Sequence, residues 1–299
     1  MDISRLKVGG AVVFWRLAKS TNLPTVAKGL RDMGLEDYIP EPRSPMSCLR
    51  AVLDDIYVPP DKEQRYVVRP HKNCHPGFAV VSERPKDHAQ AGDDWGKVVA
   101  TAHLSEAGEL SLDPWDGDRE RAIRAGMAGA AEWLTVTSVG KALVSLVEHF
   151  GGVALRPAGG VYWLNDAQLD DWAKVSDVFE AASTHSEQDP SKVYVLRVVA
   201  DEQMIRAVGD ALTVEVEKEV AEIEAEVSRA GDEQLSEKAC LRRMERADKI
   251  EAKVRRYEAA FGTPLTKLTE ATKRAAGAAA WAVLQHSVAA SPAPVTISN

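Results

Sequence analysis

Long apolar runs, a secretion signal and a cysteine framework are all missing from this chain of 299 residues. It contains no run of about eighteen uncharged apolar residues, the length that crosses a bilayer. Its first residues, Met1 to Leu6, do not form a basic flank followed by an apolar core. The three cysteines, Cys48, Cys74 and Cys240, are few and scattered, which is typical of reduced thiols. We therefore expect a cytoplasmic protein without membrane contact.

Compact catalytic motifs are also missing. No phosphate-binding Gly-x-x-x-x-Gly-Lys-Ser/Thr loop is present, because the stretch Ser138 to Lys141 lacks the first glycine at the required spacing. Neither a Gly-x-Ser-x-Gly elbow nor a His-Glu-x-x-His helix occurs. We therefore favour a non-enzymatic protein without a cofactor. An enzyme whose site is assembled from distant residues is the third interpretation of this chain.

Metal ligands are sparse, with one local concentration at His71-Lys-Asn-Cys74-His75. A structural zinc ion takes four ligands at tetrahedral positions. This loop would need help from elsewhere in the chain, and the candidates are Cys48, His88 and His103. Nothing in their spacing requires such a site, so we interpret the loop as a surface connection and expect no metal.

Positive charge is in short supply as well. The chain has 37 Lys and Arg residues against 45 Asp and Glu residues, a net charge of −8. Such a protein has no overall attraction for phosphates, so any nucleic-acid contact must be local. The length and the ordinary proportions of apolar and charged residues indicate one large or two modest globular domains.

The chain is expected to have an α+β fold, with a mixed body over residues 1–200. Runs rich in β-branched residues predict strands, and those in the middle of the body suggest an antiparallel meander. Helices are expected to begin at caps provided by Asn22, by Ser44 and by Asp116 or Asp118. The predicted strands are 10–17, 65–69, 78–83, 97–104, 109–112 and 192–199.

Residues 137–164 have the order of a winged-helix segment, a helix followed by a β-hairpin. A recognition helix of this size fits the DNA major groove. The exposed side of the predicted helix offers Lys141, and Arg156 lies near the hairpin turn, where it would reach phosphate. The alternative is an ordinary helix packed on a hairpin, with Gly159-Gly160 at the turn.

Residues 201–288 predict a helical hairpin followed by a last helix, and residues 289–299 predict a disordered tail. Apolar residues recur at steps of three and four in both arms, the spacing of a coiled-coil seam. The hinge is expected near Gly231, and Trp281 of the last helix is expected to pack against the hairpin. The seam residues are Val216, Val220, Ile223, Val227 and Ala230, then Cys240, Met244, Ala247, Ile250, Val254, Tyr257 and Phe261.

The two arms carry opposite charge. Residues 214–237 contain nine acidic and two basic residues, and residues 238–257 contain eight basic and three acidic residues. Antiparallel pairing would bring these charges together and favour one register. The basic arm also offers a cationic face for nucleic acid, which with Lys141 and Arg156 completes the candidate site. Its residues are Arg242, Arg246, Lys249, Lys253 and Arg256.

The sequence thus favours an interaction or assembly protein. Its helical arms would mediate self-association or docking to a protein partner. A nucleic-acid-binding protein that uses the winged-helix-like segment and the basic arm is the alternative.

Overall fold

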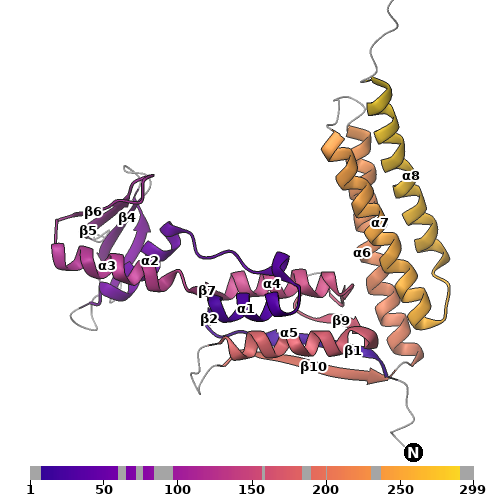
Figure 1. Ribbon diagram of the computed structural model, residues 1–299, viewed down its shortest axis with the longest axis horizontal. Helices are drawn as coiled ribbons and strands as arrows, with labels where there is room; N and C mark the ends of the chain where they lie inside the picture. The colour runs from indigo at the N-terminus through magenta and orange to yellow at the C-terminus, as the bar shows by residue number, and fades with distance from the viewer. Residues whose placement is uncertain are drawn as a thin grey trace, which may run out of the picture. The chain divides into compact units, whose positions relative to one another are not determined.

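The computed structural model confirms a mixed α+β fold (Figure 1). It describes residues 8–59, 65–71, 77–83, 97–156, 159–183, 190–199, 201–229 and 237–289. Contacts divide the chain into two units, and we describe each unit separately. The first comprises Met1–Arg16, Val144–Lys174 and Lys192–Asn299, and the second comprises Leu17–Leu143 and Val175–Ser191. The contacts therefore group the C-terminal helices with β-strands of the predicted body, while the predicted boundary at residue 200 stays a prediction.

The first unit contains a four-stranded antiparallel sheet. Its strand order is β10–β1–β9–β8, so the first strand of the chain lies at the centre beside the last. Ala11 and Val13 of β1 are fully buried on one face. On that face Trp15 stacks on Tyr162, with ring centroids 5.3 Å apart, and lies beside Trp172. The strands are β1 (Val8–Arg16), β8 (Val153–Ala154), β9 (Tyr162–Asn165) and β10 (Lys192–Val199).

Three long helices complete this unit: α6 (Glu202–Arg229), α7 (Glu237–Phe261) and α8 (Thr266–Ala289). They lie side by side and share one apolar core with Val153 and Trp163 of the sheet (Figure 1). Most residues of the predicted seams are buried in this core, but the detailed packing of a coiled coil stays a prediction. The buried seam residues are Val216, Val220, Ile223, Cys240, Ala247, Ile250, Val254 and Tyr257.

The structure differs from two predictions for the C-terminal helices, which concern the position of Trp281 and the start of the tail. Trp281 was predicted to pack against the hairpin, but it is 57% exposed and is not part of the buried core of the three helices. The core positions of α8 include Ala275 and Ala279, and Trp281 lies two residues beyond Ala279, about 200° around the helix. Of the predicted tail, Ala289 belongs to α8 and residues 290–299 lie outside the described residues, as does the predicted hinge at Gly231.

Helix α7 is fixed to the end of α4 (Val136–His149) by three side chains that donate to backbone carbonyls. Arg256 Nη1 donates to Phe150 O at 3.1 Å, Tyr257 Oη to Gly151 O at 3.0 Å, and Lys253 Nζ to Gly152 O at 2.6 Å. Cations are favourable at this end of a helix, where unpaired carbonyls concentrate negative charge. Burial raises the pKa of Tyr257, so its hydroxyl stays protonated and donating.

Glycine is required where α4 ends. The backbone of Gly151 has a φ of +72°, and its N–H donates to Glu148 O, which closes the last turn. A Cβ at this position would lie 2.0 Å from Arg256 Nη1. The glycine therefore permits both the turn and the approach of α7.

The second unit contains the predicted meander, which is confirmed as an antiparallel sheet in the order β3–β4–β5–β6. Helices α2 and α3 contribute Leu49, Leu53 and Ile123 to a core shared with this sheet. A smaller sheet pairs β2 with β7. The elements are β2 (Ser20–Asn22), α1 (Leu23–Asp32), η2 (Glu36–Tyr38), α2 (Pro45–Ile56), β3 (Arg65–Pro70), β4 (Gly77–Glu83), β5 (Lys97–Leu104), β6 (Leu110–Asp113), α3 (Gly117–Ala130) and β7 (Trp133–Thr135).

The helix caps predicted at Asn22, Ser44 and Asp116 are confirmed. Asn22 Oδ1 accepts from Thr25 N at 3.0 Å at the start of α1. Ser44 Oγ accepts from Ser47 N at 3.2 Å at the start of α2, and Asp116 is the cap of α3. These local hydrogen bonds satisfy backbone donors that have no partner within the helix.

Candidate functional site

Three of the five predicted nucleic-acid residues of the basic arm contact other parts of the chain. Arg246 is engaged by three carboxylates of α6, those of Glu219, Glu222 and Glu226, at 2.8, 3.0 and 3.1 Å. Lys253 and Arg256 hold the end of α4, and Lys253 also pairs with Glu215.

These pairs have a consistent order along the two arms. Lys253 of α7 pairs with Glu215 of α6, and Arg246, which is earlier in α7, pairs with Glu219 and Glu226, which are later in α6. This order is the one that antiparallel arms require. The positive charges of Arg246 and Lys253 are thus neutralised within the chain.

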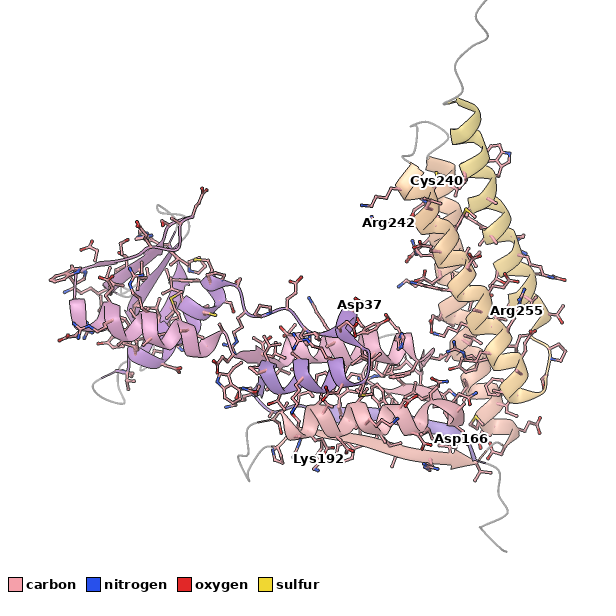
Figure 2. The ribbon with its side chains drawn as sticks, in the orientation of Figure 1. Asp37, Asp166, Lys192, Cys240, Arg242 and Arg255 are labelled. Atoms are coloured by element: carbon pink, nitrogen blue, oxygen red, sulfur yellow. The ribbon has the colours of Figure 1, made fainter. Side chains whose placement is uncertain are left out.

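The remaining predicted residues do not form one described surface. Arg242 and Lys249 are exposed on α7, and Figure 2 shows Arg242 extending away from the helix bundle. Arg156 donates through Nε to Gly159 O within its own turn. Lys141 is exposed on α4 but belongs to the second unit.

The helix and hairpin predicted over residues 137–164 are present as α4, β8 and β9. Strand β9 pairs with β8 on one side and with β1 on the other. The hairpin therefore extends a four-stranded sheet, and its Trp163 is 1% exposed.

The loop proposed as a weak metal candidate lies partly outside the described residues, which exclude Cys74, His75 and His88. His71 and His103 do come together, with ring centroids 5.4 Å apart. Nδ1 of His71 is buried without a hydrogen-bond partner in the described part of the chain. Within that part, no group of three or more potential ligands is close enough to hold a metal.

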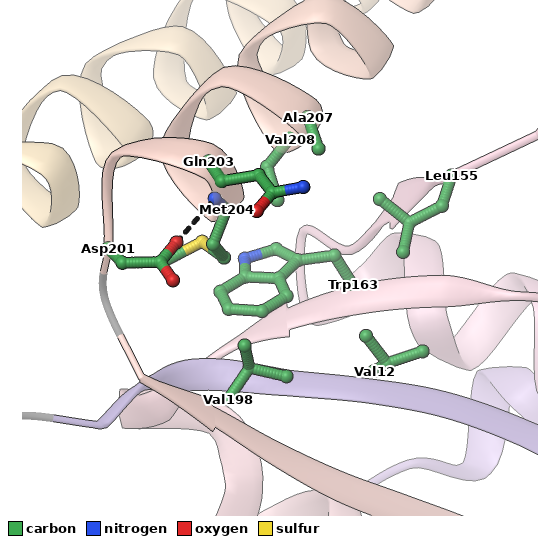
Figure 3. A pocket seen from close by; sticks show the side chains of 9 residues that line it. All are labelled: Val12, Leu155, Trp163, Val198, Asp201, Gln203, Met204, Ala207 and Val208. Atoms are coloured by element: carbon green, nitrogen blue, oxygen red, sulfur yellow. Dashed lines mark hydrogen bonds between the residues drawn. The ribbon is translucent and has the colours of Figure 1, made fainter.

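The first unit contains a cavity of about 300 Å³ between its sheet and the start of α6 (Figure 3). Its floor is the indole of Trp163, and its walls are aliphatic side chains from β1, β10, the β8–β9 turn and α6. Sequence reasoning did not find this cavity, because its lining comes from three separate stretches of the chain. The lining residues are Val12, Leu155, Trp163, Val198, Asp201, Gln203, Met204, Ala207 and Val208.

Trp163 is held in place by β1. Val12 is its cross-strand neighbour, so the two side chains share a face of the sheet. Gly10 lies two residues before Val12, and a Cβ there would lie 2.2 Å from Leu164 O and 2.5 Å from Trp163 Cζ2. The absence of a side chain at Gly10 lets the indole lie across the central strand.

The polar groups of the cavity have distinct roles. Asp201 Oδ1 accepts from Met204 N at 2.7 Å and caps α6 (Figure 3). The carboxamide of Gln203 lies on the same side of the indole as its nitrogen (Figure 3). The Nε1–H of Trp163 is buried and has no hydrogen-bond partner among the residues that the structure describes. A buried donor without an acceptor is unfavourable by about 1–3 kcal/mol, so this position is suited to an added acceptor.

The same face of the sheet continues beyond the cavity. Phe14 of β1 is opposite Tyr194 of β10, and the two rings stack with centroids 4.8 Å apart. Leu196 is opposite Val12 and is 54% exposed, and Tyr194 is 40% exposed. We call Phe14, Tyr194 and Leu196 the open face.

Strand β10 is the outer strand of this sheet, with β1 as its one neighbour among the described strands. Val195 points to the face opposite Leu196 and is itself 36% exposed. Monomeric proteins usually protect long apolar edge strands with charges, prolines or covering elements. The stretch from Tyr194 to Val199 contains one charged residue, Arg197.

These features define the class of the molecule: an α+β protein in which an antiparallel sheet is joined to three long packed helices. Residues 10–290 match a family of unknown function (DUF6744), and the chain belongs to this family. No curated protein and no solved structure matches the chain significantly. Over the described ranges, none of the helices has both the length and the apolarity that crossing a membrane requires.

Proposed function

We propose that this chain is a non-enzymatic interaction and assembly protein, and that two copies associate through the outer edges of their β10 strands. The observation that carries the proposal is the exposure of large apolar residues on both faces of this edge strand, Tyr194 and Leu196 on one and Val195 on the other. Pairing two such edges would bury them and join two four-stranded sheets into one.

The charge pattern of β10 supports a second copy as the partner. In an antiparallel pair related by a two-fold axis through Val195, Arg197 of one copy lies opposite Val193 of the other. With the axis through Leu196, Arg197 lies opposite Val195. Neither register places like charges opposite each other, and the open faces of both copies lie on the same side of the joined sheet.

The helical arms are the alternative surface through which copies of the chain could associate. The contacts of α6, α7 and α8 already bury most of the seam residues within one chain. Among the described residues of the three helices, the large apolar residues that are exposed are Val214, Leu241 and Trp281, at 60%, 48% and 57%. These three side chains are the arm positions to test.

The test is light scattering after size-exclusion chromatography of the full chain, at low and high salt. We expect a dimer that persists at high salt, because apolar burial is not screened. Val195→Lys and Leu196→Lys should each give monomers, since a lysine on either face of the edge lies near its copy across the two-fold axis. Val214→Lys, the same substitution at an exposed helical position, should remain dimeric.

The other outcomes identify other surfaces. A dimer lost only in Val214→Lys would assign the contact to the helical arms. A dimer lost only in Leu196→Lys would point to docking on the open face. A wild-type monomer that shifts only when short DNA or RNA is added at low salt would favour the nucleic-acid alternative, with Arg242 and Lys249 as the exposed cations of the basic arm.

A further inference from the structure

The cavity beside Trp163 has the features of a ligand site independent of β10 pairing. Its volume of about 300 Å³ lies at the lower end of the range of small-molecule pockets. Most of its lining is aliphatic, which favours an apolar ligand. Its floor presents one buried donor, the Nε1–H of Trp163, without an acceptor in the described part of the chain.

We propose that this cavity binds a small, uncharged, largely apolar molecule that carries a carbonyl-type hydrogen-bond acceptor. The acceptor would take the Trp163 Nε1–H, and the apolar part would contact Val12, Val198 and Met204. The Gln203 carboxamide, on the same side of the ring, would supply a second donor (Figure 3).

The polar groups of the cavity favour an uncharged ligand. Asp201 is the only ionisable residue of its described lining. A carboxylate or phosphate would lie near this side chain with no lysine, arginine or histidine of the lining to compensate it. An ammonium group offers only donors and would leave the indole N–H unpaired.

Acetophenone and ethylbenzene are suitable probes, because they share an aromatic ring and similar size and differ in the carbonyl acceptor. Binding is followed by the indole ¹H–¹⁵N resonances of the full chain, which has seven tryptophans. The Trp163 resonance is assigned by its loss in Trp163→Phe. We expect a saturable shift of this resonance, with acetophenone binding about five-fold more tightly than ethylbenzene, the contribution of one neutral hydrogen bond.

Two further variants keep the test independent of the folding of Trp163→Phe. Ala207→Leu adds volume at the cavity wall and should weaken both probes more than tenfold. Ala225→Leu makes the same change at an exposed position of the same helix, away from the lining, and should leave binding unchanged. In Trp163→Phe, which lacks this resonance, binding is followed by the backbone amide resonances of Val12, Val198 and Met204, and the preference for acetophenone should disappear.

A Trp163 resonance that neither probe shifts, or shifts that persist in Ala207→Leu, would overturn the proposal. Equal affinity for the two probes in the wild type would show that the indole N–H is not the recognition element. Because these measurements do not depend on the oligomeric state, failure of β10 pairing and failure of this inference are distinguishable.

Discussion

Replacing Gly10 with alanine tests how the central strand positions Trp163. The added Cβ would lie 2.2 Å from Leu164 O, 2.5 Å from Trp163 Cζ2 and 2.9 Å from Trp163 Cε2. Normal contacts of this kind are about 3.5 Å, so β1 and β9 must separate or the indole must move by about 1 Å. Overpacking of a well-filled core typically destabilises by about 1–3 kcal/mol, and we expect a loss in this range.

Hydrogen exchange measured by mass spectrometry is the appropriate assay, because it reports a free energy of opening for each element of a chain with two units. In Gly10→Ala, amides of β1 and β9 should exchange roughly 5- to 150-fold faster than in the wild type. The Trp163 indole resonance should shift as well, since the ring is one of the two groups in the clash.

Gly209→Ala is the matched control. Gly209 lies within α6 of the same unit, and a Cβ there would meet nothing within 4 Å. Alanine favours a helix over glycine by about 0.5–1 kcal/mol, so this variant should exchange more slowly in α6. The same chemical change thus has opposite signs at two positions. Unchanged exchange of β1 and β9 in Gly10→Ala would refute the argument that this glycine seats the indole.

Two further predictions concern the contacts around α4 and α7. Tyr257→Phe removes the hydrogen bond to Gly151 O and should lower the free energy of unfolding by about 1–2 kcal/mol, seen as faster exchange in α7; no change would mean that water replaces the hydroxyl. Partial desolvation raises the pKa of Glu148 above its usual value, although Lys253 opposes this rise. The folded state therefore binds the proton more tightly, and stability falls as the pH rises from the ordinary carboxyl pKa through the raised one. Glu148→Gln should match the wild type at acidic pH and become more stable than it towards neutral pH in urea titrations; a constant difference across pH would contradict this.

The local signals in the sequence were reliable because they act over a few residues. The caps at Asn22, Ser44 and Asp116 were identified from residue type and position, and all three accept the expected helical N–H groups. The meander was predicted from β-branched runs separated by turn residues, and its strands pair in sequence order. Hydrogen bonds of this kind join neighbours in the chain, so sequence alone determines them.

Long-range pairing was not accessible in the same way. Strand β10 was predicted with its observed bounds. Its pairing with β1, about 180 residues away, was not predicted, because it depends on which strand edges stay unpaired after the rest of the sheet forms. Trp281 was assigned to packing from its apolar character, and the helical phase relative to α6 and α7 places it on the exposed side instead.

The basic arm illustrates the same division between sequence and structure. Its opposite charge to the preceding arm was evident from composition, but only the tertiary structure decided that Arg246 meets three glutamates and that Arg256 meets the end of α4.

The sequence by itself determined the caps at Asn22, Ser44 and Asp116, the strands of the meander, and that an acidic arm precedes a basic one. The tertiary structure alone decided the cavity, because Val12, Trp163 and Val198 belong to segments far apart in the chain. The periodicity of apolar residues specifies which face of a helix or strand is apolar. It does not specify which other helix or strand packs against that face. The Trp163 N–H, which has no partner among the described residues, is a consequence of which faces come together in the tertiary structure.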